Sequence, residues 1–379
     1  MPHPRSADLA VRHAGVRRAL DTLSLDAFVA TNATNVRYLT NHAGSAGIAV
    51  VTAAAVHLLV DFRYVEAVRA LQASDFACPT LVERRVPASY DEALLECLAE
   101  IGASTVGFEA AHVTVSRYEW LVRSAGARGL DLAFRPTEHV VEELRLVKDD
   151  AEIALLREAA RRITAVAAAA VAAVRPGVTE RTVAAVIEAG LREAGYDRPA
   201  FDTIVASGPN GALPHYRAGT RILEAGDAVV LDFGGVLDGY CCDLTRTVSV
   251  GSPSAEARRV HAAVLEAQQA AIAAVRPGMA AADVDAAARG VLERHGLGEA
   301  FGHGTGHGLG LDVHEEPRVS RPQPEVPSRR LEAGMVFTIE PGAYLPGWGG
   351  VRIEDDVLVT ADGCEVLTSA PHDLFTPRP

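Results

Sequence analysis

Hydrophobic and polar positions alternate in short blocks through the first part of the chain. Runs of β-branched and aliphatic residues predict strands, and longer stretches with helical periodicity between them predict helices. This succession is typical of an α/β domain of modest size. We expect this part to be structural or to wall off a substrate pocket, because it gathers no histidines, cysteines or acids into a site. The predicted strands are 27–30, 48–52 and 56–60, and the predicted helices are 8–23, 64–73 and 90–101.

A charged passage near Leu146 interrupts this pattern and predicts a domain boundary. The alanine-rich stretch 151–174 that follows predicts a long helix, with Asp149 or Asp150 as its N-cap. We therefore expect two domains, residues 1–146 and 147–379.

The second part of the chain repeats its own pattern. Val-Arg-Pro-Gly occurs at 174–177 and again at 275–278, and Leu-Glu-Ala-Gly occurs at 223–226 and again at 331–334. Matches in the same order at nearly one spacing indicate an internal duplication. Each copy reads as helix, Pro-Gly turn, helix and hairpin. We expect the copies to pack sheet to sheet about a pseudo-twofold axis, with the helices outside.

Each repeated hairpin carries two carboxylates among β-forming residues. The first copy has Asp232 and Asp243, and the second has Glu340 and Glu354. A single acid in such a run is more often a solvent-facing strand residue. Four acids duplicated on matching apolar hairpins are too costly to bury unless a positive charge neutralises them. The simplest source of that charge is a pair of divalent metal ions.

Turn signals place the acids of each hairpin on one face. The Asp-Gly pair at 238–239 is a strong two-residue hairpin signal. With this pair at the tip, Asp243 lies opposite Gly234, on the face that carries Asp232, because side chains alternate with a period of two. The two glutamates of the second copy lie symmetrically about Gly347 and are expected to face each other.

Histidines are concentrated in a glycine-rich stretch that contains His303 and His307 and is followed by His314. The glycines allow close backbone approach or a positive φ, and the intervening Gly-Thr-Gly argues against an HExxH zinc helix. One imidazole on a metal and others directed at a substrate explain this density better than structural roles do. His215, which follows a Ser-Gly-Pro-Asn-Gly loop, is a fourth candidate.

Composition narrows the classes of partner. The net charge of −13 and the pI near 5.5 argue against nucleic acid, whose phosphates need a basic surface. The five scattered cysteines fit reduced thiols better than a disulfide framework. The longest apolar stretch, 163–174, is too short to span a bilayer, and the arginine-rich N-terminus is no signal peptide. We expect a cytoplasmic protein without a membrane partner.

Four ordered blocks resemble the signature segments of the pita-bread metallopeptidases: LDFGG-x₄-YCCDLTRT, GHGTGHGLGLDVHE, TIEPG and VRIEDDVLV. That group includes methionine aminopeptidase, aminopeptidase P, Xaa-Pro dipeptidase (prolidase) and creatinase. Residues 35–40 and 61–64 also resemble the N-terminal domain of the Xaa-Pro branch, so the resemblance covers the whole chain. It implies an α/β (α+β) fold, with a smaller creatinase-like domain before a pita-bread domain that contains an internal pseudo-twofold duplication.

The resemblance also implies the site, position by position. Glu340, His215 and His314 would be catalytic, with both histidines facing the substrate. His303, as a pocket histidine, and Arg352, as a partner of the acids, would belong to substrate binding. The implied metal ligands are Asp232, Asp243, His307, Glu340 and Glu354.

One departure from the family pattern is Cys242, where small residues such as serine or alanine are usual before the aspartate. Strand parity points Cys242 away from the acids, which favours a packing role, with thiol ligation as the alternative. Cys241 shares the parity of Asp243 and is expected to be a neighbour of the metals.

Four carboxylates and one imidazole favour Mn²⁺ or Co²⁺, with Zn²⁺ or Fe²⁺ as alternatives. Two such ions would activate a water molecule and stabilise the oxyanion of a scissile amide. We expect an Xaa-Pro dipeptidase that acts on small peptides with proline at the second position. The alternatives are an aminopeptidase P acting on longer Xaa-Pro peptides, a catalytically silent binding homologue and a non-peptide amide hydrolase. The resemblance further implies a homodimer.

Overall fold

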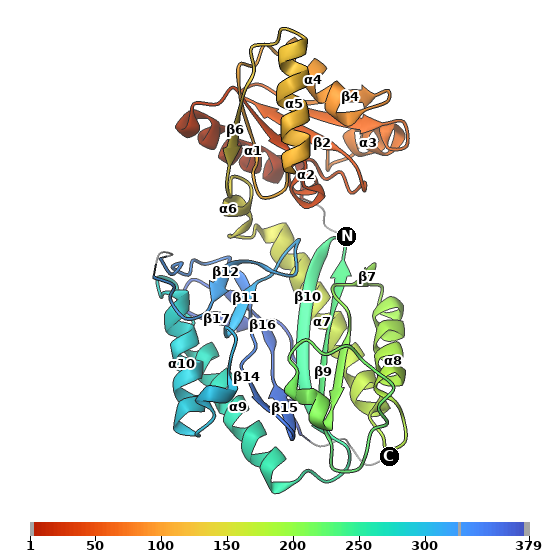
Figure 1. Ribbon diagram of the computed structural model, residues 1–379, viewed down its shortest axis with the longest axis vertical. Helices are drawn as coiled ribbons and strands as arrows, with labels where there is room; N and C mark the ends of the chain where they lie inside the picture. Colours follow the sequence, from red (N-terminus) through yellow and green to blue (C-terminus); the bar gives the residue numbers. More distant parts are fainter. Residues whose placement is uncertain (1–3, 325–326, 375–379) are drawn as a thin grey trace. The chain divides into compact units, whose positions relative to one another are not determined.

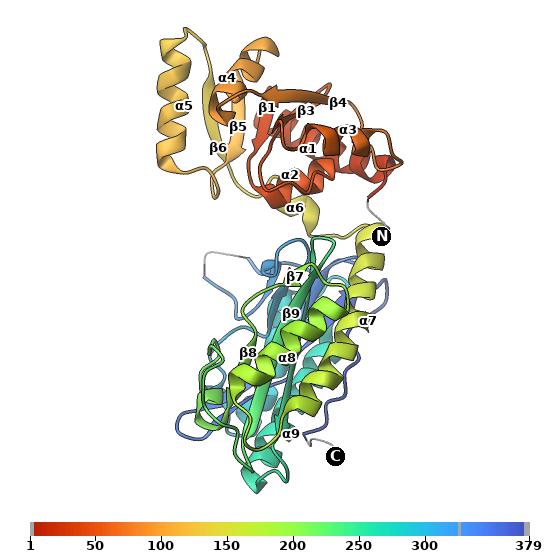
Figure 2. The same ribbon diagram turned by 90° about the vertical axis from the view of Figure 1, so that its right-hand side faces the viewer.

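The computed structural model of the protein describes residues 4–324 and 327–374. These residues form two compact units, one ending at Arg145 and one beginning at Leu146. We describe each unit by itself, and Figures 1 and 2 show the elements of both.

The first unit is a mixed six-stranded sheet in the order β4-β3-β2-β1-β5-β6. Strands β1 and β2 are antiparallel to each other, whereas β5 and β6 extend the sheet in parallel. Every residue of β1 is buried, as expected for a strand that is covered on both faces. The strands are β1 (Ala27–Ala30), β2 (Ile48–Thr52), β3 (Val56–Asp61), β4 (Leu81–Val86), β5 (Thr105–Glu109) and β6 (Ala133–Thr137).

Helices α4 and α5 pack on one face of this sheet, where Leu94 and Leu121 join Val29 and Val50 in one apolar core. Burial of each such side chain contributes on the order of 1.5–3 kcal/mol. The elements predicted from periodicity are confirmed to within about two residues, whereas α2, α5, α6, β4, β5 and β6 were not predicted. The helices are α1 (Ser6–Leu23), α2 (Ala33–Thr40), α3 (Val65–Gln72), α4 (Tyr90–Glu100), α5 (Val115–Ala127) and α6 (Glu142–Arg145).

The second unit begins with the predicted long helix α7 (Asp150–Ala173). Asp149 is its N-cap: its Oδ1 accepts from Glu152 N, and Glu152 Oε2 accepts from Asp149 N, each at 2.9 Å. This reciprocal capping box satisfies two backbone donors that would otherwise lack partners. Glu152 also accepts from the Tyr240 hydroxyl at 2.8 Å, which ties the start of the helix to the first hairpin.

Backbone geometry repeats between the two halves of this unit. The glycines of the two Val-Arg-Pro-Gly segments have nearly the same positive φ, 86° at Gly177 and 84° at Gly278. Each donates its N–H to the leucine that opens the repeated Leu-Glu-Ala-Gly segment, at 3.0 and 2.7 Å. The structure therefore contains the duplication that the sequence repeats indicate. The helices of the two halves are α7, α8 (Glu180–Glu193), α9 (Ala255–Ala274) and α10 (Ala281–Arg294).

The strands of the two halves lie side by side, and the helix pairs cover them from outside (Figure 1). Figure 2 shows α7 and α8 across the face of the first sheet, which has the order β10-β9-β7, with β8 also paired to β9. The first half contains β7 (Arg198–Pro199), β8 (Ile204–Ser207), the 3₁₀ helix η1 (Gly208–Ala212), β9 (Ala228–Leu237) and β10 (Tyr240–Ser249).

The second sheet has the order β12-β11-β13-β16-β17, and β14 pairs with β15 beside it. The two halves meet at strand edges: Glu354 N donates to Thr245 O at 3.1 Å, and Arg352 N donates to Thr247 Oγ1 at 3.0 Å. The second half contains η2 (Gly298–Ala300), β11 (Gly306–Gly308), β12 (Glu315–Val319), β13 (Val336–Ile339), β14 (Gly342–Leu345), β15 (Gly349–Arg352), β16 (Asp355–Val359) and β17 (Cys364–Val366).

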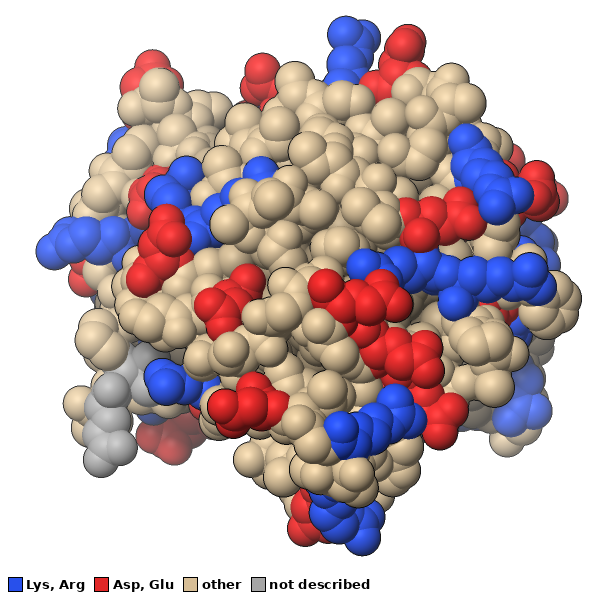
Figure 3. Space-filling model, turned by 90° about the horizontal axis from the view of Figure 1, so that it is seen from above, with Lys and Arg blue, Asp and Glu red and all other residues tan. Residues whose placement is uncertain are grey.

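Basic and acidic side chains are interspersed over the face of the molecule that Figure 3 shows. Among the helices of the described residues, none combines the length and the apolar character needed to cross a membrane.

Candidate metal centre

The first hairpin has the predicted register. Asp243 pairs with Gly234, and Thr245 pairs with Asp232, so the two acids lie on one face of the β9–β10 ladder. The tip is the predicted Asp-Gly turn, with φ of 47° and 82° at 238 and 239, as a type I′ turn requires.

The second hairpin keeps one register across an interruption. Gly342 pairs with Arg352 on the β14–β15 side, and Ile339 pairs with Asp355 on the β13–β16 side. Glu340 and Glu354 lie between these two ladders, at mutually opposite positions. Their N–H groups leave the hairpin: Glu340 N donates to Thr305 O at 2.7 Å, and Glu354 N donates across to the first half. At this break in the ladder, the backbone of each glutamate is therefore bonded to a neighbouring segment.

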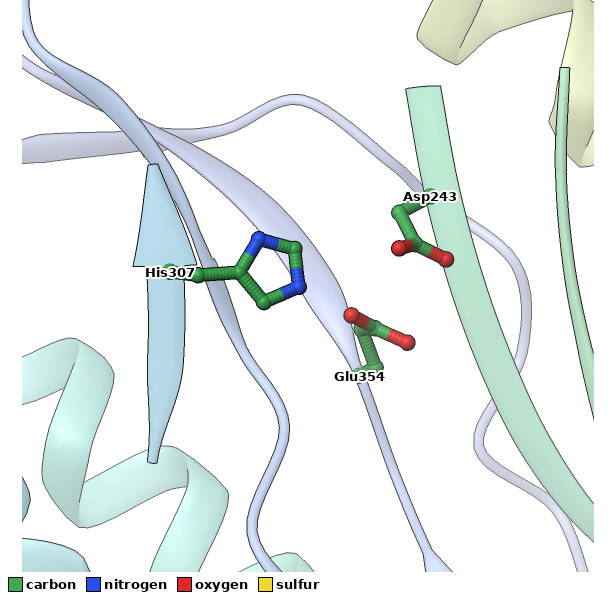
Figure 4. A group of neighbouring side chains, drawn as sticks. All are labelled: Asp243, His307 and Glu354. Carbon is green, nitrogen blue, oxygen red and sulfur yellow. The ribbon is translucent and has the colours of Figure 1, made fainter. Parts of the chain in front are cut away.

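Asp243, His307 and Glu354 converge on one point. Each offers a ligand atom, and these atoms all lie within 4.8 Å of one another. Figure 4 shows the three side chains directed toward the same space from β10, β11 and the segment between β15 and β16. Carboxylate oxygens and an imidazole nitrogen at this separation are a typical donor set for a divalent cation.

The two remaining acids adjoin this group. Glu340 Oε1 lies 3.6 Å from His307 Nε2. Asp232 lies on the same face as Asp243, and its negative charge adds to burial in raising the pKa values of Asp243, Glu340 and Glu354. Asp232 is held from the other side by the guanidinium of Arg352. The structure therefore brings all five predicted ligand positions together.

Burial raises the pKa of three of these carboxyls, and their mutual repulsion adds to the effect. The pKa of Glu340 rises to about 8, and those of Asp243 and Glu354 also lie well above the usual range. Burial, together with nearby His314, lowers the pKa of His307 to about 4. His307 is therefore neutral at pH 7, which is the form that binds metals.

Two buried oxygens test whether these residues fit metal ions. Asp232 Oδ1 and Asp243 Oδ1 are buried, and neither has a hydrogen-bond partner among the described residues. Leaving a charged acceptor buried and unsatisfied costs several kcal/mol. In the part of the chain that the structure describes, the arginine that pairs with this group of acids is Arg352, which contacts Asp232. Its single charge does not balance four carboxylates. Divalent cations would supply both the missing charge and the missing contacts, so the residues fit the expected metal ions.

Tyr344 connects two of the predicted pocket residues. Its hydroxyl accepts from Arg352 Nη1 at 2.6 Å and lies 2.8 Å from His303 Nε2. His303 Nδ1 lies 2.7 Å from Gly304 O and must donate there, so Nε2 accepts from Tyr344. Burial lowers the pKa of His303 to about 4, which keeps this tautomer neutral. The arrangement orients His303 and Arg352 as one unit.

The other two predicted histidines lie near this unit. The rings of His314 and His307 are 4.3 Å apart between centroids. His215 is exposed. Burial lowers the pKa values of His303 and His314, and the charge of His215 adds to the effect on both. Pro214 O accepts from Arg352 Nη2 at 3.4 Å. The segment that carries His215 therefore contacts the arginine that also holds Asp232.

Some functional neighbours were not predicted from the sequence. Thr245 Oγ1 donates to Glu354 Oε2 at 2.6 Å, and Asp356 Oδ2 accepts from Asp243 N at 3.1 Å. The alternation along β10 could have identified Thr245, because it lies two residues after Asp243 on the same face. The contact of Asp356 joins the two halves, so strand parity within one hairpin does not reveal it.

The adjacent cysteines differ in their surroundings. Cys242 Sγ lies 3.2 Å from Asp356 Oδ2, and Cys241 Sγ lies 4.0 Å from Leu311 O. Among the described residues, neither belongs to the group of side chains that could hold a metal ion. Both thiols are buried, and burial raises the pKa of each, so both remain protonated at neutral pH.

Comparison with known proteins agrees with this geometry. Residues 154–361 match the model of metallopeptidase family M24, and residues 12–147 match the creatinase/prolidase N-terminal domain. An uncharacterized peptidase of Bacillus subtilis is 38% identical over 360 residues, which cover 95% of this chain and 98% of that protein.

Solved structures share the fold over nearly the whole length. A Xaa-Pro dipeptidase from Bacillus anthracis has a TM-score of 0.89 at 38% identity, with 97% of this chain and 99% of that one covered. An X-Pro aminopeptidase from Thermotoga maritima has a TM-score of 0.83 at 35% identity, with 96% and 99% covered. These matches confirm the expected fold, a pita-bread domain preceded by a creatinase-like domain. The chain belongs to metallopeptidase family M24, whose enzymes depend on divalent metal ions.

Proposed function

We propose that this protein hydrolyses the peptide bond between an N-terminal residue and a following proline, as an Xaa-Pro dipeptidase. The observation that carries the proposal is the convergence of Asp243, His307 and Glu354 on one point, with Asp232 and Glu340 beside them. Two buried aspartate oxygens of this set lack hydrogen-bond partners among the described residues. The similarity to the B. anthracis Xaa-Pro dipeptidase over nearly the full length supports the choice of substrate.

In this proposal two divalent ions are held by the five predicted ligands. An oxygen-rich set with one imidazole favours Mn²⁺, with Co²⁺, Zn²⁺ or Fe²⁺ as alternatives. When bound, such ions polarise the scissile carbonyl and lower the pKa of water. The proposed ligands are Asp232, Asp243, His307, Glu340 and Glu354.

The remaining roles belong to side chains around this group. Glu340 accepts the proton of the attacking water and passes it to the leaving proline nitrogen. His314 and His215 hydrogen-bond the scissile carbonyl and the tetrahedral intermediate. His303 and Arg352, joined through Tyr344, line the substrate side. Arg352 also holds Asp232 in place.

An aminopeptidase P activity on longer Xaa-Pro peptides is the second candidate. The similarity to the T. maritima X-Pro aminopeptidase over 96% of this chain favours it. The two activities differ in whether the pocket closes over the carboxylate of proline. A dipeptidase must bind that carboxylate, whereas an aminopeptidase must leave room for a peptide extension.

The experiment compares Gly-Pro with a tripeptide of the Xaa-Pro-Xaa type, using protein loaded with Mn²⁺. We expect turnover of the dipeptide, and we expect Asp243→Asn to lose most of the activity and part of the metal. Turnover of only the tripeptide would establish the second candidate. Failure on both peptides with metal bound would contradict both activities and favour a catalytically silent homologue or a hydrolase of other amides.

We also propose a cytoplasmic homodimer whose functional domains are residues 1–146 and 147–379. The family match of both parts supports the domain assignment. Sedimentation as a monomer at every protein concentration would contradict the dimer.

A further inference from the structure

The loop that carries His215 is fastened to a fully buried carboxylate on another element. Glu180 lies at the start of α8, and its side chain is inaccessible to solvent. Its two oxygens accept five hydrogen bonds, all from residues 207–219: from Ser207 N at 2.9 Å, Ser207 Oγ at 2.7 Å, Asn210 Nδ2 at 2.9 Å, Tyr216 OH at 2.9 Å and Gly219 N at 3.2 Å.

The contacts bracket His215 on both sides along the chain. Ser207 and Asn210 precede it, and Tyr216 and Gly219 follow it, so one carboxylate closes the loop. Hydrogen bonds to a charged acceptor are worth roughly twice as much as neutral ones. Five of them on a buried group fix the loop far more firmly than its irregular backbone would fix itself.

A second set of contacts fixes the loop against the other half of the unit. A Cβ on Gly350 would lie 2.0 Å from Gly211 O, and a Cβ on Gly349 would lie 2.7 Å from Gly208 O. The backbone of η1 therefore rests directly on β15. The same strand ends at Arg352, which donates to Pro214 O at 3.4 Å. The loop is thus held between Glu180 and the strand that leads to the metal site.

The neighbour of His215 also packs on the strand that carries a proposed ligand. The Tyr216 ring contacts the small apolar cluster of Ile204, Ala206 and Val230. Val230 lies two residues before Asp232 on β9, so it faces the same side of the strand. Tyr216 therefore connects Glu180, the His215 loop and strand β9, which carries Asp232.

From these contacts we infer that Glu180 is a positioning residue that holds the 207–219 loop so that His215 faces the metal centre. The inference rests on the proposed function for the role of His215, but the anchoring of the loop does not depend on that role. Glu180 lies outside the proposed ligand set and acts through the loop. A displacement of a substrate-facing group by about 1 Å can cost about a hundredfold in rate.

Limited proteolysis tests the anchoring without any substrate. Arg217 lies in the loop, and its side chain is 86% exposed, so trypsin can report how often the 217–218 bond becomes accessible. We expect Glu180→Ala to speed cleavage at this bond about tenfold or more in metal-free protein, and Glu180→Gln to give a smaller increase because its amide keeps one acceptor oxygen. Glu188→Ala, an exposed glutamate on the same helix, should cleave like the wild type.

A double-mutant cycle tests whether the loop acts through His215. We expect Glu180→Ala to lower kcat/KM about 10–100-fold in the wild-type background and less than about threefold when His215 is already alanine. Metal content should equal that of the wild type in both backgrounds. If Glu180→Ala does not fold, Glu180→Gln and Tyr216→Phe serve in its place, since each removes only part of the network.

Two results would overturn the inference: unchanged cleavage at the 217–218 bond, or an equal loss of kcat/KM in both backgrounds. Absence of Xaa-Pro turnover in the wild type would instead contradict the proposed function. The cleavage rates would still decide whether Glu180 holds the loop.

Discussion

At the scale of single residues, the second half of the second unit contains a buried acid, Asp285, that holds the segment around His303. Asp285 on α10 forms a buried ion pair with Arg289, with a shortest N–O distance of 2.8 Å. Asp285 Oδ1 accepts from Thr305 N and Oγ1, and Arg289 Nη2 donates to His303 O at 2.9 Å. The pair thus fixes the backbone just before His307.

Replacing Asp285 by Asn should leave the guanidinium of Arg289 buried without its counter-charge. We expect a loss of about 3–5 kcal/mol in the free energy of unfolding, because removal of one partner from a buried pair exposes the full desolvation cost of the other. Urea denaturation of the chelated protein measures this. Asp283→Asn, an exposed position on the same helix, should cost less than about 1 kcal/mol. Equal losses in the two variants would show that the pair adds little.

At the scale of elements, the position of β11 decides where His307 lies. A Cβ on Gly306 would lie 1.8 Å from Thr338 O on β13, so the two backbones approach as closely as only glycine permits. The neighbouring bond from Glu340 N to Thr305 O fixes the same segment. A short three-residue strand is thereby held against the hairpin that carries two of the acids.

We expect Gly306→Ala to push β11 away from β13 and to weaken Mn²⁺ binding at least about tenfold, an effect of the size seen when groups that orient metal ligands are lost. Calorimetric titration of the chelated protein with Mn²⁺ measures the affinity. Gly302→Ala is the matched control, since a Cβ there meets nothing within 4 Å. Wild-type affinity in Gly306→Ala would mean that His307 reaches the site without this close packing.

At the scale of the whole molecule, the buried histidine His261 contributes to the dependence of stability on pH. Burial lowers the pKa of His261, on α9, from 6.5 to about 4. The charges of His372 and Arg246 add to the effect, whereas a backbone hydrogen bond with His372 and the charge of Asp373 oppose it. Between these two pH values the unfolded chain binds a proton that the folded protein does not. The contribution of His261 to the free energy of unfolding therefore falls as the pH falls from 6.5 toward 4.

We expect His261→Gln to remove this dependence. Relative to the variant, the wild type should lose about 2–3 kcal/mol of stability between pH 7 and pH 4. Denaturation of both proteins in excess chelator, at several pH values, excludes the pH dependence of metal binding. Parallel stability curves for the two proteins over this range would show that His261 takes up its proton equally in the folded and unfolded states.

The local features of this fold could be read from the sequence because they depend on neighbours in the chain. Period-two alternation and the Asp-Gly turn predicted the register that places Asp232 and Asp243 on one face. The symmetric positions of Glu340 and Glu354 predicted their opposition, although not the break in the ladder that ties each glutamate to another segment. The repeated tetrapeptides predicted the duplication.

Contacts between distant segments were decided only by the tertiary structure. The sequence by itself determined which residues share a strand face, because side-chain direction follows from the backbone period. It did not determine that Thr245 bonds Glu354, that Asp356 holds the backbone of Asp243 or that Glu180 fastens the His215 loop. Each of these contacts joins segments separated by many residues, and their distance depends on how the sheets and helices pack together.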